Sequence, residues 1–197
     1  MVVANETRPD QARLDSTLSV ILRGKTVAGG QFTPSVAGIT FGAQPVDAEG
    51  RLSLVGLRQV LVGPFEAVVR SGPPARESPD PVAVVRPDGG FGIGGVMSVP
   101  GVAGIILILF AFAYAESFLR PIRKGRRPGP GVLIGMGLVG AVAGLGTAVV
   151  GWALGSHLLS GALLFLCGLG GLATAALLTV AVVQAAAAPV TARRSRR

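Results

Sequence analysis

The chain has 197 residues, a formal net charge of +8 and an isoelectric point near 11.4, yet 50% of its residues are hydrophobic and only 14% are charged. A soluble protein that binds nucleic acid needs basic side chains over a broad surface, and this composition supplies too few of them. The hydrophobicity also excludes an intrinsically disordered chain. One Cys excludes an intrachain disulfide, and with a single His no zinc site is expected. The Ala-, Gly- and Arg-rich composition is typical of a GC-rich bacterial genome.

Residues 1–70 are predicted to form a small β domain. Short apolar runs alternate with turn residues about every ten positions, which favours a β-sandwich. Asp47 and Gly50 mark the clearest turn, because Asp accepts hydrogen bonds from nearby backbone and Gly adopts positive φ. The expected strands are 17–22, 26–27, 38–41, 51–54, 59–62 and 65–69. The expected core is Leu18, Val20, Leu22, Ile39, Phe41, Leu52, Leu54, Leu57, Val60, Phe65 and Val68.

The stretch VAGITFGAQPVDAEGRLSLVGL resembles part of the carboxypeptidase-regulatory-like, prealbumin-type β-sandwich, within residues 36–70. The matching residues are Gly38, Asp47, Gly50, Leu52, Leu54, Gly56 and Leu57. Ile39 stands in place of the usual Val, Leu52 in place of the usual aromatic residue, and Gly63-Pro64-Phe65 in place of the closing motif. The resemblance implies an extracytoplasmic, non-catalytic spacer or contact module.

Residues 71–98 form a Pro- and Gly-rich segment that is predicted to be a linker, with one edge strand at 82–85 as an option. No signal peptide is recognisable in the first residues. The whole stretch of residues 1–98, which precedes the first span, is hard to export unaided. We therefore expect a signal that was removed, a misplaced start or an assisting partner, and favour the first.

Residues 99–197 are predicted to be a domain of three transmembrane helices, at about 99–119, 131–154 and 158–183. A bilayer core of about 30 Å needs about 20 helical residues, so each run is long enough. Ser98 is the expected N-cap of the first helix, and Pro121 is expected to end it after Arg120. A short turn at 155–157 makes the second and third spans an antiparallel hairpin. The fold class is therefore an α+β membrane protein.

The net charge comes from two basic clusters beside these spans, because residues 1–95 are neutral overall. The positive-inside rule places both clusters in the cytoplasm and the β domain outside. Both clusters are also expected to contact anionic lipid. The first cluster is Arg120, Arg123, Lys124, Arg126 and Arg127, and the second is Arg193, Arg194, Arg196 and Arg197.

Small residues recur at helical spacing on the second and third spans. Such stripes let helices approach closely in lipid, where they either pack against each other or bind a second protein or another copy of the chain. The expected packing or interface residues are Gly137, Gly140, Gly144, Gly151 and Gly155 on the second span and Gly161, Gly168 and Gly171 on the third.

Glu116 is the only residue inside a span whose side chain is charged at neutral pH, and an interfacial salt bridge with Arg120 is the expected role. Tyr114 and Trp152 are expected to be interface anchors. Ser156, His157 and Ser160 lie together near a hairpin tip, where a sequestered catalytic pair is not expected. No catalytic, cofactor-binding or metal-ligating residue is predicted.

These features predict a non-enzymatic membrane subunit, an accessory or scaffold component of a bacterial complex for transport, secretion or envelope assembly. The expected partners are lipids and other membrane subunits or copies of the chain, without nucleic acid. The alternative is a homo-oligomeric channel, for which Thr147 is the one polar residue that the second span offers to a pore.

Overall fold

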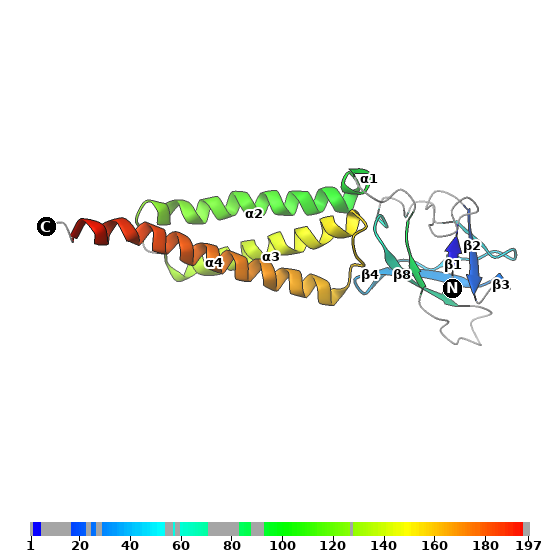
Figure 1. Ribbon diagram of the computed structural model, residues 1–197. Coiled ribbons are helices and arrows are strands. Elements are labelled where there is room, and N and C mark those ends of the chain that lie inside the picture. Colours follow the sequence, from blue (N-terminus) through cyan, green and yellow to red (C-terminus); the bar gives the residue numbers. More distant parts are fainter. Residues whose placement is uncertain are drawn as a thin grey trace. The chain divides into compact units, whose positions relative to one another are not determined.

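The computed structural model describes residues 2–4, 17–22, 25–26, 29–53, 57, 60–70, 83–87, 93–126 and 128–194. These residues form a small antiparallel β region followed by three long apolar helices (Figure 1). The chain divides into two compact units. Unit 1 comprises Met1–Val102 and Val149–Gly161, and unit 2 comprises Ala103–Ala148 and Ala162–Arg197. The β region therefore shares a unit with the segment that joins the last two helices.

The first sheet is built around β2 (Thr17–Leu22), which has the bounds expected from its apolar alternation. It pairs antiparallel with β1 (Val2–Ala4), β3 (Lys25–Thr26) and β7 (Arg51–Ser53). The turn that leads into β7 also forms as expected, because Asp47 Oδ1 accepts hydrogen bonds from the amides of Glu49 at 3.0 Å and Arg51 at 2.6 Å. Gly50 closes this turn with a φ of 77°.

The second sheet runs in the order β5 (Ile39–Thr40), β4 (Gln31–Val36), β8 (Phe65–Arg70) and β9 (Ala83–Val85), and β6 (Gln44–Pro45) also pairs with β4. β4 lies inside this sheet and was not expected, because Pro34 interrupts its sequence. β6 pairs near one end of β4 and β5 near the other. Pro34 lies between them, where its carbonyl accepts a hydrogen bond from Phe41 N. β5 and β6 both stop short of the position opposite Pro34, so the proline lies at an interruption of the strand pairing on this side of β4.

The core of the β region consists mainly of buried residues from the second sheet and its connections. These are Phe32, Val36, Val46, Leu52, Leu61, Val62, Phe65, Ala67, Val69 and Val85. Two expected core residues are exposed instead, Ile39 at 67% and Val60 at 40%. The strand expected at 59–62 is wrong over its described part, because the amides of Val60 and Leu61 both donate to the carbonyl of Leu57. That helical turn brings Leu61 into the core.

The segment expected to be a linker contains regular structure. β9 pairs with β8 as an edge strand, and α1 (Ile93–Val96) precedes the first long helix. The rest of the Pro- and Gly-rich stretch, 71–82 and 88–92, lies outside the described residues.

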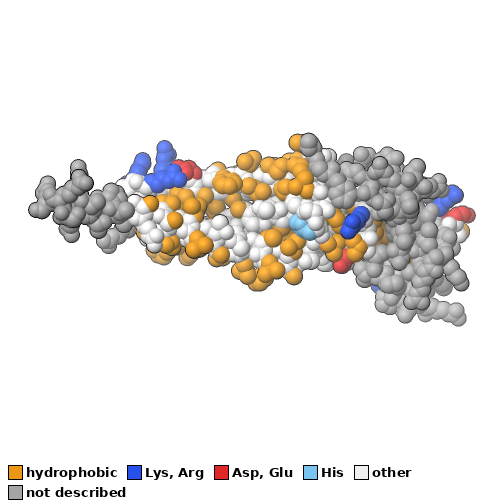
Figure 2. Space-filling model, in the orientation of Figure 1, with side chains coloured by type: hydrophobic (Ala, Val, Ile, Leu, Met, Phe, Trp, Pro, Cys, Tyr) orange, Lys and Arg blue, Asp and Glu red, His pale blue; other side chains and the backbone are white. Residues whose placement is uncertain are grey.

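Within the described part of the chain, three helices are long and apolar enough to cross a membrane: α2 (Val99–Arg123), α3 (Pro130–Ala153) and α4 (Gly161–Arg194), the last over Gly161–Ala185. Many of their large hydrophobic side chains are exposed, as Figure 2 shows along the helices. Such a surface suits lipid and does not suit water. These features are those of a multi-pass membrane protein.

The helix ends follow local capping rules. Ser98 caps α2 as expected, since its hydroxyl accepts a hydrogen bond from Gly101 N at 3.3 Å. α2 continues past Pro121 to Arg123, so the end expected after Arg120 is wrong. It ends at a Schellman motif in which Gly125 has a φ of 80° and Arg126 N donates to Pro121 O.

In unit 2 the helices bury a cluster formed by Leu119 and Ile122 of α2, Met136 of α3 and Ala175 of α4. Hydroxyl groups on these helices bond to the carbonyl four residues earlier, as Thr179 does to Ala175 at 2.7 Å. Polar side chains are thus satisfied without water.

Candidate functional site

The most specific contact in unit 1 joins the β region to the end of α3. Trp152 is only 3% exposed, and its indole Nε1 donates a 2.7 Å hydrogen bond to the carbonyl oxygen of Pro64. Buried indoles usually find such an acceptor. Trp152 was expected to anchor the helix at a lipid interface, but its ring is covered by protein. We call this contact, together with the Ala37–Leu159 contact described below, the junction.

Gly63 makes the junction possible. A Cβ at this position would lie 2.2 Å from the carbonyl oxygen of Trp152 and 2.6 Å from its Nε1. Only a residue without a side chain lets the two backbones approach so closely. Three consecutive residues have separate roles here. Gly63 leaves space for Trp152, Pro64 accepts the hydrogen bond of its indole, and Phe65 begins β8.

A second backbone contact completes the junction. The amide of Ala37 donates a 3.0 Å hydrogen bond to the carbonyl of Leu159, in the loop between α3 and α4. Ala37 and Gly38 have φ values of 53° and 83°, which is the geometry of a type I′ turn between β4 and β5. Ala37 is the one non-Gly residue with positive φ among those described. The bond to Leu159 helps to stabilise this unfavourable conformation.

The loop after α3 is closed by its own side chains. The Ser156 hydroxyl lies 2.6 Å from the carbonyl oxygen of Gly151 and 2.8 Å from His157 Nδ1. Gly155 has a φ of 76°, and Ser156 N donates to Gly151 O, which is a Schellman cap. When the serine proton goes to Gly151, His157 Nδ1 must be the donor to Ser156 and is not a base for that hydroxyl. The arrangement is that of a helix cap.

The predicted glycine stripes meet in unit 2. A Cβ at Gly140 would lie 2.3 Å from Gly171 O, and one at Gly144 would lie 2.0 Å from Cys167 O. α3 and α4 therefore approach at backbone distance over one turn of helix, as close packing in lipid requires. These contacts are packing of the stripes against each other, and the second interpretation, binding of a second protein or another copy, stays a prediction.

The other predicted glycines have different surroundings. Gly137 and Gly168 make only ordinary contacts, with Leu172 and Leu145 respectively. Gly161 begins α4 in open space, and Gly151 is covered by His157 within unit 1. Gly155 was expected on the packing face of the span, but it follows the end of α3 and forms its cap.

Two glycines outside the predicted set face α2. A Cβ at Gly135 would lie 2.6 Å from Phe118, and one at Gly146 would lie 2.8 Å from Gly104 O. They are eleven residues apart, which is close to three helical turns, so they share one face of α3, roughly 120–140° around the helix axis from Gly140. This spacing is the sequence signal that would have revealed a second packing face.

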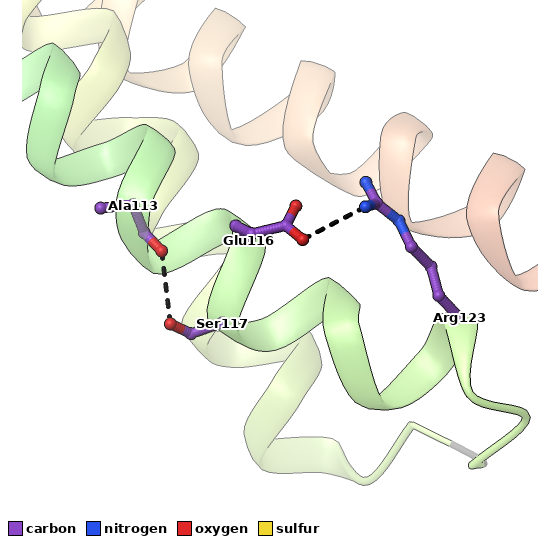
Figure 3. Close-up of polar contacts among 4 residues, drawn as sticks. All are labelled: Ala113, Glu116, Ser117 and Arg123. Carbon is purple, nitrogen blue, oxygen red and sulfur yellow. Dashed lines mark hydrogen bonds and ion pairs between the residues drawn. The ribbon is translucent and has the colours of Figure 1, made fainter.

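Glu116 forms its ion pair with Arg123 instead of Arg120. The 3.2 Å contact joins Glu116 Oε1 to Arg123 Nη1, and both side chains are 57% exposed (Figure 3). Seven residues are nearly two full turns, so both side chains lie on one face. Arg123 was not expected as the partner, because α2 was predicted to end after Arg120. Arg123 lies on the same helix face as Glu116 only if the helix continues to residue 123. Ser117, one residue on, bonds to Ala113 O at 3.3 Å.

The basic cluster after α2 is exposed. Lys and Arg side chains gather near one end of the helices in Figure 2, and Arg120, Arg123, Lys124 and Arg126 are exposed residues. Arg127, Arg196 and Arg197 lie outside the described residues, as do the side chains of Arg193 and Arg194 at the end of α4. Exposed cations beside apolar helices suit the headgroup region of a membrane.

Comparison of the chain with family models, with curated proteins and with solved structures gave no match.

Proposed function

We propose that the chain is a non-enzymatic integral membrane subunit, an accessory or scaffold component of a bacterial membrane complex that presents an extracytoplasmic β domain. The observation that carries this proposal is the junction. A domain held only by a Pro- and Gly-rich linker would move freely. The hydrogen bonds Trp152–Pro64 and Ala37–Leu159 fix this one to the loop between α3 and α4 as well. A fixed position suits a domain whose task is to offer a surface to a partner.

The β domain in this proposal is a small sandwich of the two sheets. Proximity of β1 to β9 and of β6 to β7 supports it, since each pair joins one strand from each sheet. The prealbumin-type resemblance of residues 36–70 fits the same role, a spacer or contact module with no assigned catalytic, cofactor or metal residue.

In the proposed orientation the β domain lies outside and the C-terminus lies in the cytoplasm. The exposed cations Arg120, Arg123, Lys124 and Arg126 support it, because basic loops remain in the cytoplasm. The loop between α3 and α4, which carries no acidic or basic residue apart from His157, is then on the same side as the β domain.

Native mass analysis after purification in mild detergent tests the proposal. We expect stoichiometric partner chains with the wild-type protein and with Gly42→Ala, since a Cβ at Gly42 meets nothing within 4 Å. Gly63→Ala should reduce the bound partner, because it disturbs the junction that orients the β domain. A homo-oligomer as the only species would contradict the proposal and favour a channel.

A further inference from the structure

The turn between β4 and β5 lies at the level where two membrane spans end. The amide of Ala37 in this turn donates to the carbonyl of Leu159, two residues before α4 begins. α3 ends at Ala153, on the other side of the same loop. The proposed function requires that α3 and α4 cross the bilayer. The loop that joins them then lies at the membrane boundary, and the bonded turn lies there too.

Ile39 follows this turn and is 67% exposed. Its cross-strand partner Val36 is buried, and so are most apolar residues on that face of the sheet, such as Phe32 and Val69. Ile39 projects beyond the core because β5 is only two residues long. A large aliphatic side chain at the end of a tight hairpin is unfavourable in water and favourable in the apolar boundary of a bilayer.

The chain segment that contains the turn carries no charged side chain. Residues 26–46 contain no Asp, Glu, Lys or Arg, although the first 95 residues carry charges on both sides of this stretch. The turn itself consists of Ala37 and Gly38. Charged groups strongly disfavour entry into the apolar layer, and the turn itself has none. The nearest charge on the adjacent strand is the exposed Glu66 of β8, which pairs with Ser35 and so lies on the face of the sheet opposite to that of Val36 and Ile39.

We propose that the turn between β4 and β5 inserts into the lipid boundary of the membrane, with Ile39 as the side chain that enters it. The partner is the lipid surface, and the inference rests on the proposed membrane function. The turn then gives the β domain a contact with lipid in addition to the junction, and orients its opposite end away from the membrane. That end carries Pro45, which pairs with Gln31 at the far end of β4, and the charged turn after it.

Depth-dependent fluorescence quenching tests this proposal on the full-length chain. Single Cys residues are placed at Ile39, Ala48 and Leu166 in a Cys167→Ala background, labelled with an environment-sensitive fluorophore and reconstituted in liposomes with nitroxide-labelled lipid. Ala48 is exposed in the charged turn at the far end of the sheet, and Leu166 is 63% exposed on α4. All three positions accept a label without entering a core.

The label at 39 is expected to be quenched at least about twofold more than the label at 48, because apolar groups at the boundary lie about 5–10 Å deep, within reach of the nitroxide. The label at 166 should be quenched strongly. Quenching at 166 with equal, weak quenching at 39 and 48 would overturn the insertion and leave the membrane function standing. That outcome would also indicate that a protein partner, and not lipid, covers Ile39. Weak quenching at 166 would overturn the membrane function and the insertion together. Unchanged Trp152 emission in each variant verifies the fold.

Discussion

Trp152 and Pro64 are 88 residues apart in the sequence, and the indole of Trp152 donates a 2.7 Å hydrogen bond to the carbonyl of Pro64. The bond ties the last turn of an apolar helix to the start of β8, and Gly63 leaves the space that it needs. Since Trp152 is the only tryptophan of the chain, its fluorescence reports on this contact directly.

Gly63→Ala is expected to open the junction. The new Cβ would lie 2.2 Å from backbone oxygen, which cannot move aside as a side-chain end could. Trp152 should then become more accessible, with red-shifted emission and greater quenching by acrylamide. Gly42→Ala is the matched control, because its Cβ meets nothing within 4 Å. Equal acrylamide quenching in the two variants would contradict the described junction.

Trp152→Phe is expected to remove the hydrogen bond while keeping most of the ring's packing. The carbonyl of Pro64 would be left buried without this donor, which costs about 1–3 kcal/mol. Hydrogen exchange should accelerate in peptides that cover residues 60–70 and remain unchanged in peptides from the middle of α3. Unchanged exchange over residues 60–70 would show that the bond does not hold the β region in place.

The sequence predicted the elements whose signals are local. The alternation of Thr17–Leu22 gives β2 its bounds, the Asp47 turn forms through the side chain that suggested it, and the three apolar runs become α2, α3 and α4. Ser98 caps α2 because the hydroxyl and the helix start are close together in the chain. In each case the determining interaction spans only a few residues.

Features that depend on distant contacts could not be predicted in the same way. β4 was missed because a strand that contains Pro34 is tolerated here only through the gap between the short strands β5 and β6, which the local sequence does not reveal. Trp152 resembled a lipid anchor because nothing near it in the sequence indicates Pro64. Gly155 fitted the spacing of the helical stripe, but its left-handed conformation ends the helix first. These outcomes depend on packing between segments far apart in the sequence.

Gly144→Ala is expected to destabilise unit 2, because its Cβ would lie 2.0 Å from Cys167 O at the closest approach of α3 and α4. Overpacking of this kind costs about 1–3 kcal/mol. The thermal unfolding midpoint in detergent should fall. Gly170→Ala is the control on α4, since a Cβ there meets nothing within 4 Å and Ala favours the helix. A midpoint for Gly144→Ala equal to that of Gly170→Ala would rule out close packing of the two helices.

Glu116→Gln is expected to change stability little. The ion pair with Arg123 joins two side chains that are each 57% exposed, and exposed pairs contribute about 0–1 kcal/mol. Unfolding in detergent at low and at high salt measures this effect, with Glu116→Asp as the conservative control. A loss well above that range, insensitive to salt, would show that Glu116 has a buried structural role.

The central claim is that the chain spans the membrane with its β domain outside and the loop after α2 inside. Labelling of single Cys residues with a membrane-impermeant maleimide in intact cells tests it, at Ala48 and Lys124 in a Cys167→Ala background. Both positions are exposed. Labelling at 48 from outside, with labelling at 124 only after the membrane is permeabilised, is the predicted result. Labelling at 124 and not at 48 in intact cells would contradict the proposed orientation.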